Sequence, residues 1–217
     1  MLQDDRNFRV GRCAEILASA LWQQVGFAHI DVAAAAMRGA PLVNTWEGSF
    51  VAADGLMIRR GTFLHEIKYK QRSNVSRGGA VGSKWIPRGA RFHAIEAPND
   101  RSYRRQWKRT GLPFVLTVVC EEDAELLAST LWRLGEPYPS LQPELYDVVD
   151  YPVDRFARIW TFDKRRLAKF FNQDPRTLTS ARMRLFLDWL RPQQAEFDFL
   201  VRDLVSQLED QWRTEGR

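Results

Sequence analysis

Residues Phe114 to Val119 form an apolar run rich in β-branched side chains, and Gly111 and Pro113 stand just before it. A run of this length is short for a buried helix and is typical of a strand covered on both faces. Such a strand lies inside a sheet that has helices on both sides. The run therefore indicates the centre of an α/β fold.

Helices and strands alternate around this run. Apolar residues recur at helical spacing over 11–27, which predicts a helix there. Residues 29–36 suit either a buried strand or a continued helix, because their periodicity does not separate the two. The remaining predicted elements are a helix over 100–109 with Asp100 as its N-cap, helices over 122–134 and 164–171, and a strand over 156–162. The pattern predicts a mixed central sheet flanked by helices.

Beyond Asn172 the sequence predicts helices alone. One covers 179–190, and a second begins at Pro192, a residue that suits the first turn of a helix. We therefore expect an α/β core over 1–172 and a C-terminal helical extension over 173–217, which packs on the core or forms a dimer contact. The apolar stripe of the second helix would consist of Phe197, Leu200, Val201, Leu204, Val205, Leu208 and Trp212.

The composition is that of an ordinary globular domain. The chain has 217 residues and is 45% hydrophobic, which is enough to bury a core and excludes a wholly disordered chain. Cys13 and Cys120 have no His or Cys nearby at metal-binding spacing, so neither a zinc site nor a disulfide framework is predicted. No stretch approaches the roughly 18 apolar residues of a membrane span, and charged residues occupy the N-terminal segment. We expect a soluble, cytoplasmic protein.

Charge is distributed unevenly, although the formal net charge is only +5. Residues 72–109 contain ten Lys or Arg against two acidic residues, whereas residues 110–150 contain one Arg against eight acidic residues. Nucleic acid is a natural partner for the basic segment, and the alternative is a surface that is merely solvated or paired with the acidic segment. The basic segment also contains aromatic residues that could stack on bases, namely Trp85, Phe92, Tyr103 and Trp107.

Two extended segments, 50–58 and 62–70, are separated by Arg59, Arg60 and Gly61. This pattern predicts a β-hairpin with a three-residue loop. In such a hairpin the residues that flank the loop, 58 and 62, pair with each other.

This register places Asp54 opposite Glu66, with both side chains on the same face. Lys68 projects from that face as well, because it lies two residues further along the same strand. A two-residue turn at positions 60 and 61 would instead oppose Asp54 to Ile67 and turn its side chain to the other face.

Two carboxylates on one face of a hairpin repel each other unless a cation or a proton lies between them. Their oxygens suit Mg²⁺, which takes one or two carboxylates together with water and substrate phosphate. A lysine beside them could orient or activate a water molecule. Asp54, Glu66 and Lys68 therefore match the needs of phosphodiester hydrolysis. Asp31 or Glu47 could replace Asp54 if the hairpin were built differently.

Asp54 followed after eleven residues by Glu66-Ile67-Lys68 resembles the PD-(D/E)xK nuclease motif, with Ala53 where the motif has proline. The preceding helix with Glu15 resembles the acidic first helix of many members, notably archaeal Holliday junction resolvases and the VRR-Nuc group. The resemblance covers residues 11–119, about half of the chain. Its downstream part consists of Ser102, Gln106, Trp107 and Gly111 before the apolar strand, which resemble the helix and strand that complete the same core.

The resemblance implies a restriction-endonuclease-like fold and a metal-dependent endonuclease that hydrolyses DNA to leave 5′-phosphates. It implies that Asp54, Glu66 and Glu15 hold Mg²⁺, for which Mn²⁺ could substitute. It also implies that Lys68 positions or deprotonates the attacking water and that Gln106 supports the site.

DNA is the partner that this interpretation implies, with a homodimer or a larger nucleoprotein complex as further possibilities. A non-catalytic module that binds nucleic acid or a partner is the alternative, and RNA is a possible substrate because nothing in the sequence distinguishes recognition of the 2′-hydroxyl. The residues expected to contact the nucleic acid backbone are Lys70, Arg72, Arg77, Lys84, Arg88, Arg104, Arg105 and Lys108.

Overall fold

The computed structural model describes residues 2–31, 42–45, 48–51, 53–59, 61–81, 84–141, 147–195 and 202. The elements of the first half are α1 (Leu2–Gln24), β1 (Ala28–Asp31), β2 (Leu42–Thr45), β3 (Gly48–Val51), β4 (Gly55–Ile58), β5 (Thr62–Lys70), β6 (Asn74–Val75), β7 (Gly79–Val81), β8 (Lys84–Ile86), β9 (Arg91–Glu96) and α3 (Ala97–Thr110). Those of the second half are β10 (Phe114–Cys120), β11 (Glu125–Thr130), α4 (Leu131–Leu134), β12 (Tyr138–Pro139), β13 (Val148–Pro152), α5 (Lys164–Phe171), α6 (Ser180–Leu190) and β15 (Gln193–Gln194), with β14 (Ala157–Thr161) between the 3₁₀ turns η1 (Val153–Arg155) and η2 (Pro175–Thr177).

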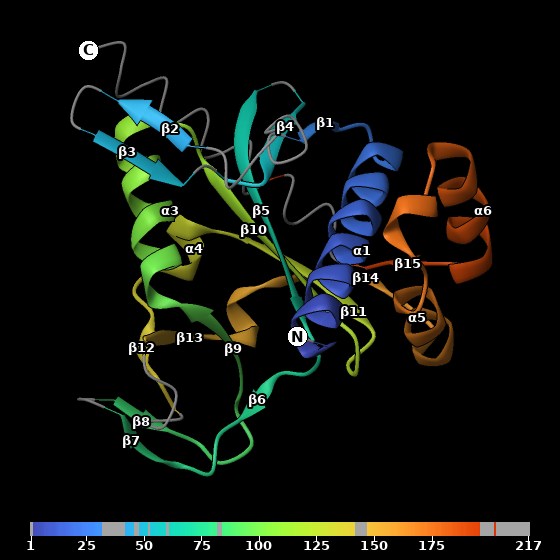
Figure 1. Ribbon diagram of the computed structural model, residues 1–217. Helices are drawn as coiled ribbons and strands as arrows, with labels where there is room; N and C mark the ends of the chain where they lie inside the picture. The colour runs from blue at the N-terminus through green and yellow to red at the C-terminus, as the bar shows by residue number, and fades with distance from the viewer. Residues whose placement is uncertain are drawn as a thin grey trace.

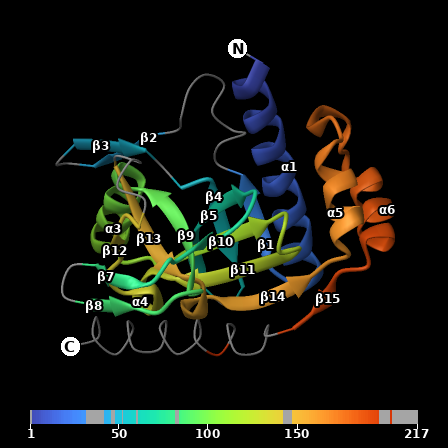
Figure 2. The ribbon, with the colours of Figure 1, turned by 90° about the horizontal axis from the view of Figure 1, so that it is seen from below.

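A mixed sheet of seven strands, in the order β1-β4-β5-β10-β11-β14-β15, forms the centre of the molecule. The pair β5–β10 is parallel, and every other neighbouring pair in this sheet is antiparallel. Figure 1 shows α1, α5 and α6 on one side of the sheet and α3 on the other, and the view in Figure 2 agrees. The mixed α/β class with flanking helices is confirmed. A smaller sheet, β12-β13-β9-β6, lies on the α3 side.

The central strand predicted from Phe114 to Val119 is confirmed as β10, all of whose residues are buried. Its side chains alternate between two hydrophobic clusters, one on each face of the sheet. Val115 and Val119 belong to the cluster beneath α1, α5 and α6, whereas Leu116 and Val118 belong to the cluster beneath α3. Strand β10 is therefore covered on both faces by packed helices, as its composition indicates.

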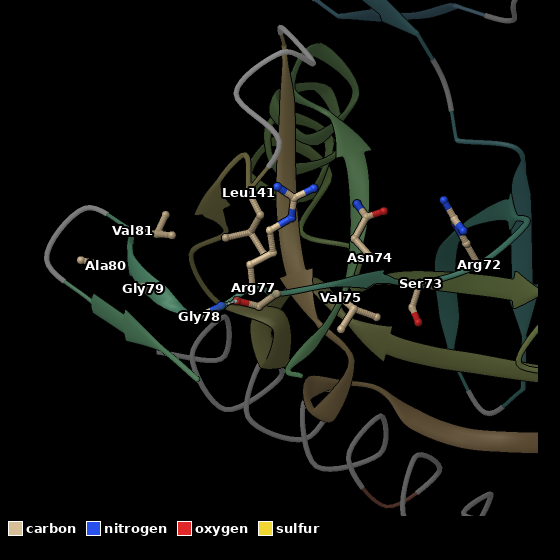
Figure 3. A pocket seen from close by; sticks show the side chains of 11 residues that line it. Arg72, Ser73, Asn74, Val75, Arg77, Gly78, Gly79, Ala80, Val81 and Leu141 are labelled. Atoms are coloured by element: carbon tan, nitrogen blue, oxygen red, sulfur yellow. Dashed lines mark hydrogen bonds between the residues drawn. The ribbon is translucent and has the colours of Figure 1, made fainter. Parts of the chain in front are cut away.

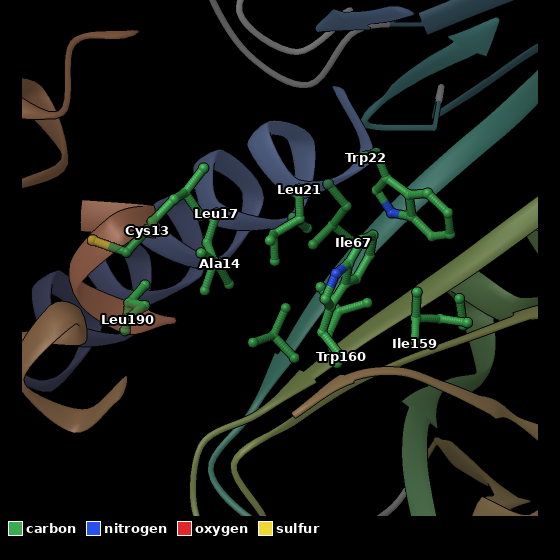
Figure 4. Packing of buried hydrophobic residues seen from close by; sticks show 14 of the residues in the cluster. Cys13, Ala14, Leu17, Leu21, Trp22, Ile67, Ile159, Trp160 and Leu190 are labelled. Atoms are coloured by element: carbon green, nitrogen blue, oxygen red, sulfur yellow. The ribbon is translucent and has the colours of Figure 1, made fainter. Parts of the chain in front are cut away.

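Aromatic rings fill much of the core beneath α1. Trp22 of α1 meets Trp160 of β14 edge to face, with ring centroids 5.3 Å apart, and also packs against Phe27. Figure 4 shows Leu17, Leu21 and Trp22 pointing from α1 toward the sheet. Helix α1 begins at Leu2, earlier than the predicted residue 11.

The predicted hairpin register is confirmed. Ile58 pairs with Thr62 and Gly55 with His65, so a three-residue loop joins β4 to β5. The strand predicted over 50–58 is, however, interrupted. β3 ends at Val51 and pairs with β2, β4 begins only at Gly55, and Asp54 occupies the bend between them. Of residues 29–36, for which the periodicity allows either a strand or a helix, 29–31 belong to strand β1, and 32–36 lie outside the described part of the chain.

The helix predicted over 122–134 is wrong for most of its length. Residues Glu125–Thr130 form β11, and only Leu131–Leu134 are helical. Glu, Leu and Ala favour helices locally, but every side chain of β11 is buried between β10 and β14. Tertiary packing therefore overrides local propensity. The buried Glu125 carboxylate is neutralised by Arg91 at 2.7 Å and Arg158 at 2.8 Å.

The expected N-cap role of Asp100 is also wrong. Helix α3 starts three residues earlier with Glu96 at the N-cap, and Pro98 lies in its first turn, where the missing N–H of proline costs nothing. Asp100 is buried and accepts hydrogen bonds from Arg104 and Tyr151. The predicted end of this helix is confirmed, since Gly111 caps it in the left-handed conformation with φ of 67°.

The helices predicted over 164–171 and 179–190 are confirmed as α5 and α6, the second with Thr179 as its N-cap. Met183, Leu187 and Leu190 of α6 join the cluster beneath α1. The helix expected from Pro192 does not begin there, because Gln193–Gln194 pair with β14 as a strand. The apolar stripe predicted over 197–212 lies outside the described residues.

Cys13 and Cys120 are both buried free thiols. Among the described helices, none combines the length and the apolar character that crossing a membrane requires.

Candidate active site and nucleic-acid interface

Asp54 lies where β5 loses its neighbour on one side, because the pairing between β4 and β5 ends at Gly55 and His65. The Asp54 carboxylate takes the place of the missing strand by accepting the Ile67 main-chain N–H at 2.8 Å through Oδ2. The main-chain N–H of Asp54 in turn donates to Glu66 Oε2 at 3.2 Å. The two carboxylates that the sequence pairs are therefore brought together by the main chain.

Glu66 is only 4% exposed, and its carboxylate is compensated from three directions. Lys68 Nζ lies 2.6 Å from Oε1, and the Tyr103 hydroxyl of α3 donates to the same oxygen at 2.6 Å. With the Asp54 N–H on the other oxygen, both oxygens of Glu66 have partners within the protein. The ring of Tyr103 also lies under the Lys68 ammonium, 5.9 Å from the ring centroid.

These contacts shift the protonation equilibria of the site. Burial and, second to it, the negative charge of Glu66 raise the pKa of Asp54 to about 7, against the Ile67 hydrogen bond, which lowers it. Burial by itself would lower the pKa of Lys68, but attraction to Glu66 and Asp54 gives a net rise. Lys68 is therefore a cation at neutral pH, whereas Asp54 is held near the midpoint of its titration.

Glu15 approaches the site from α1, and its negative charge contributes to the raised pKa of Asp54. Burial raises the pKa of Glu15 itself. Its carboxylate is bound by Arg12, one turn earlier on the helix, whose guanidinium also reaches Asp31 at 2.7 Å. Arg12 thus ties Glu15 to the end of β1. Asp31, an alternative to Asp54 in the sequence, is engaged in this ion pair, and Glu47 lies outside the described residues.

Gln106 supports the site through the main chain. Its side chain is fully buried, and its Oε1 accepts the N–H of Ala53, the residue before Asp54, at 3.1 Å. A proline at position 53 would have no N–H to donate. Ala53 and Gln106 therefore form a matched pair that holds the segment leading to Asp54.

Two further residues of the site, Tyr103 and Arg12, are not predicted as site residues from the sequence. Asp100, Tyr103 and Gln106 recur at three-residue steps on α3 and are all buried, so helical periodicity could have placed Tyr103 beside Gln106 on the inner face. Arg12 and Glu15 stand three residues apart on α1, a spacing that favours an ion pair.

Most of the expected phosphate-contacting residues are exposed, but two lie elsewhere. The Arg104 guanidinium points into the protein, where it binds Asp100, Tyr151 and the carbonyl oxygen of Gly135. Lys70 is half-buried on the Glu66 face of β5, and burial lowers its pKa against the attraction of Glu96. The exposed members are Arg72, Arg77, Lys84, Arg88, Arg105 and Lys108.

The four aromatic residues of the basic segment also differ in exposure. Phe92 and Tyr103 are buried, and Trp107 is half-buried against the cluster beneath α3. Only Trp85 of the four is exposed, at 76%.

The donor set of the site suits a hard divalent cation only in part. No described residue donates a hydrogen bond to Asp54 Oδ1. The negative charge of Glu66 is one of the causes that raise the pKa of Asp54, so a cation beside the two carboxylates would stabilise the ionised form of Asp54. Within the described ranges, however, no three His, Cys, Asp or Glu side chains are arranged to hold a metal ion. Asp54 and Glu66 could thus supply two ligands to Mg²⁺, with Glu15 joining only if it leaves Arg12.

Comparisons with known proteins add nothing to these observations, since no protein-family model matches the sequence and no significant match is found among curated proteins.

Proposed function

We propose that the protein is a Mg²⁺-dependent deoxyribonuclease of the PD-(D/E)xK superfamily, with a restriction-endonuclease-like core, and that it hydrolyses DNA to leave 5′-phosphates. The observation that carries this proposal is the cluster of Asp54, Glu66 and Lys68 at the break before β4. Their types and spacing are those of the motif, and the register brings the two carboxylates and the ammonium to one place.

The chain topology supports the same proposal. Helix α1 precedes three antiparallel strands, β1, β4 and β5, and helix α3 then leads to β10, which is parallel to β5. The core of the PD-(D/E)xK nucleases, which the sequence resembles, has the same order of a first helix, a hairpin with the motif, a second helix and a final strand.

In this proposal Asp54 and Glu66 hold Mg²⁺, and Glu15 assists when it is released from Arg12. The bound ion would polarise the phosphoryl group and lower the pKa of water. Because the pKa of Lys68 is raised, we assign it the positioning of water and the stabilisation of negative charge, and not the removal of a proton. From α3, Tyr103 holds the Glu66 carboxylate, and Gln106 holds the main chain at Ala53, just before Asp54.

The proposal is tested by incubating the protein with plasmid and linear DNA in Mg²⁺, in Mn²⁺ and in EDTA. Glu66→Gln and Lys68→Met are expected to reduce cleavage by at least about 100-fold. Glu122→Gln and Lys164→Met, which change exposed residues of the same types, are the matched controls and should cleave normally. Cleavage that both site variants retain in full would refute the assignment, as would cleavage in EDTA.

A non-catalytic binding module remains the second candidate, and one observation favours it. Both oxygens of Glu66 are already satisfied by the protein, and no third described acid completes a metal-binding group. Calorimetric titration with Mg²⁺ and Mn²⁺ separates the two. The nuclease requires binding that Asp54→Asn weakens, whereas a module would bind DNA with no measurable affinity for either ion. Labelled RNA in the cleavage assay tests a ribonuclease.

A further inference from the structure

Strands β7 and β8 form a small hairpin that projects from the body of the protein beside β6 (Figure 1). Lys84 and Ile86 lie on one face of β8 and Trp85 on the other, because side chains alternate along a strand. Ile86 is 3% exposed, and Lys84 Nζ lies 4.8 Å from the centroid of the Tyr138 ring. The Lys84 and Ile86 face is therefore turned toward the protein, and the indole of Trp85 is turned outward.

The cross-strand partner of Trp85 is Ala80, which is itself exposed. A methyl group beside the indole leaves most of the ring accessible, in agreement with its 76% exposure. A single exposed indole does not by itself mark a contact site, so the charge and shape of its surroundings must decide what it could bind.

The chain segment that carries this indole favours an anionic partner. Residues 72–91 contain five Lys or Arg and no Asp or Glu. One of the five, Arg91, is paired with Asp123 and Glu125, but the other four are exposed. A protein partner with an apolar pocket would not require this uniform charge, whereas a nucleic acid combines phosphates with stacking bases.

A groove runs along the base of the hairpin and could take the backbone of such a partner. It has a volume of about 530 Å³ and is lined by residues of β6 and β7 together with Arg72, Arg77 and Leu141. Figure 3 shows the Arg77 side chain extending beside Leu141 and Asn74, with Arg72 at the other end of the strand. The chain that lines the groove follows β5, which carries Glu66 and Lys68, after a bend at residues 71 and 72.

The base of the hairpin is built from backbone conformations that favour glycine. Gly78 and Gly89 have φ of 85° and 87°, and a Cβ on Gly78 would lie 3.2 Å from the Cβ of Arg88. Main-chain hydrogen bonds from Ser76 to Ala90 and from Gly89 to Ser76 close the base. The hairpin that carries Trp85 is thus held at its base by main-chain hydrogen bonds and by turns that favour glycine.

We propose that Trp85 is a base-stacking platform and that the protein binds DNA containing unpaired nucleotides, with a base stacked on the indole and the phosphate backbone contacted by Arg72 and Arg77 along the groove. This inference rests on the proposed function for the choice of DNA as partner. In fully paired DNA the bases are stacked on one another and their faces are not available, so the platform discriminates by structure and not by sequence.

The test measures binding in EDTA, where metal-dependent cleavage cannot contribute. The probes are a fluorescein-labelled short duplex and the same duplex with an unpaired tail, and the readout is fluorescence anisotropy. Trp85→Ala should weaken binding of the tailed probe by about 5- to 150-fold, the range for loss of one stacked base, and change duplex binding by less than about 2-fold. Trp85→Phe should recover most of the affinity, because its ring can still stack. Trp132→Ala removes another exposed indole, 63% exposed on α4, and should change neither affinity.

Equal losses on both probes, or no loss on either, would overturn the proposal, as would a similar effect of Trp132→Ala. Failure of the nuclease proposal gives a different result, since a protein that binds the tailed probe through Trp85 but never cleaves in Mg²⁺ retains the platform. The opposite result is also distinguishable. If cleavage depends on Glu66 but Trp85→Ala binds both probes normally, the nuclease proposal stands and the stacking proposal is refuted.

Discussion

Asp54 and Glu66 are joined through the Asp54 main-chain N–H, which donates to Glu66 Oε2 at 3.2 Å. The Asp54 carboxylate is anchored in turn on the N–H of Ile67, the residue after Glu66. Each acid is thus positioned by the backbone of the other segment. Two carboxylates so placed, that of Glu66 buried and that of Asp54 half-buried, repel each other, and the repulsion is relieved by a proton on Asp54 or by a cation between them.

Asp54→Asn should make stability less dependent on pH. The folded protein raises the pKa of Asp54 from an ordinary value near 3.8 to about 7, so the proton binds more tightly in the folded state. The stabilisation from Asp54 is therefore fully present below about pH 4 and is lost as the pH rises through about 7. The loss is at most about 1.4 kcal/mol per pH unit.

The measurement is urea unfolding of both proteins in EDTA across this pH range. A neutral amide can still accept the Ile67 N–H, so the free energy of unfolding of Asp54→Asn should equal or exceed that of the wild type. The difference between the two free energies should grow between about pH 4 and pH 7, as Asp54 ionises in the wild type, and should be constant above that range. Glu122→Gln, an exposed change of the same charge, is the control. A margin that does not vary with pH would contradict the burial of an ionised Asp54.

Tyr103→Phe should lower the free energy of unfolding by about 1–2 kcal/mol, because the buried hydroxyl donates to a charged carboxylate. Tyr69→Phe removes a hydroxyl that donates to Glu121 at the half-buried surface and should have a smaller effect. Chemical denaturation of the three proteins at neutral pH checks the order. Equal stabilities of wild type and Tyr103→Phe would show that Lys68 and Asp54 alone suffice to hold Glu66.

Two glycine-to-alanine changes should have opposite signs. A Cβ on Gly55 would lie 2.5 Å from the Ile30 carbonyl oxygen and 2.8 Å from His29 Nε2, so Gly55→Ala must push β1 away from β4. We expect a loss of about 1–3 kcal/mol. Gly11 lies within α1, and a methyl group there would meet no atom within 4 Å, so Gly11→Ala should gain about 0.5–1 kcal/mol. Thermal unfolding measures both, and a stabilising Gly55→Ala would contradict the close approach of β1.

Combined replacement of Arg72 and Arg77 by Ala should reduce the salt dependence of DNA binding. Each phosphate contact contributes a slope of about 0.9 in a plot of log affinity against log salt, so the slope should fall by up to about 2. Arg165→Ala, which removes an exposed arginine of α5 away from the groove, serves as the control and should leave the slope unchanged. An unaltered slope in the double variant would remove the groove from the DNA-binding surface.

Local patterns in the sequence determined much of the architecture. The hairpin register followed from the loop at 59–61, and α5 occupies the residues 164–171 that its periodicity predicted. The central strand followed from its apolar run. In each of these cases the residues that decide the structure are near one another in the chain, so turn geometry and side-chain period are sufficient.

Tertiary structure decided the rest. Residues 125–130 have helix-favouring side chains, yet they form a strand because all of them are buried between β10 and β14. Arg91 and Arg158, each more than thirty positions from Glu125, neutralise the buried charge of that residue. The pairing of Asp54 with Glu66 was readable from the sequence, but the contacts of Tyr103, Gln106 and Arg12 with that pair depend on where α3 and α1 pack. The same holds for Trp85, the one exposed member of its aromatic group, because exposure is a property of the folded surface and not of residue type.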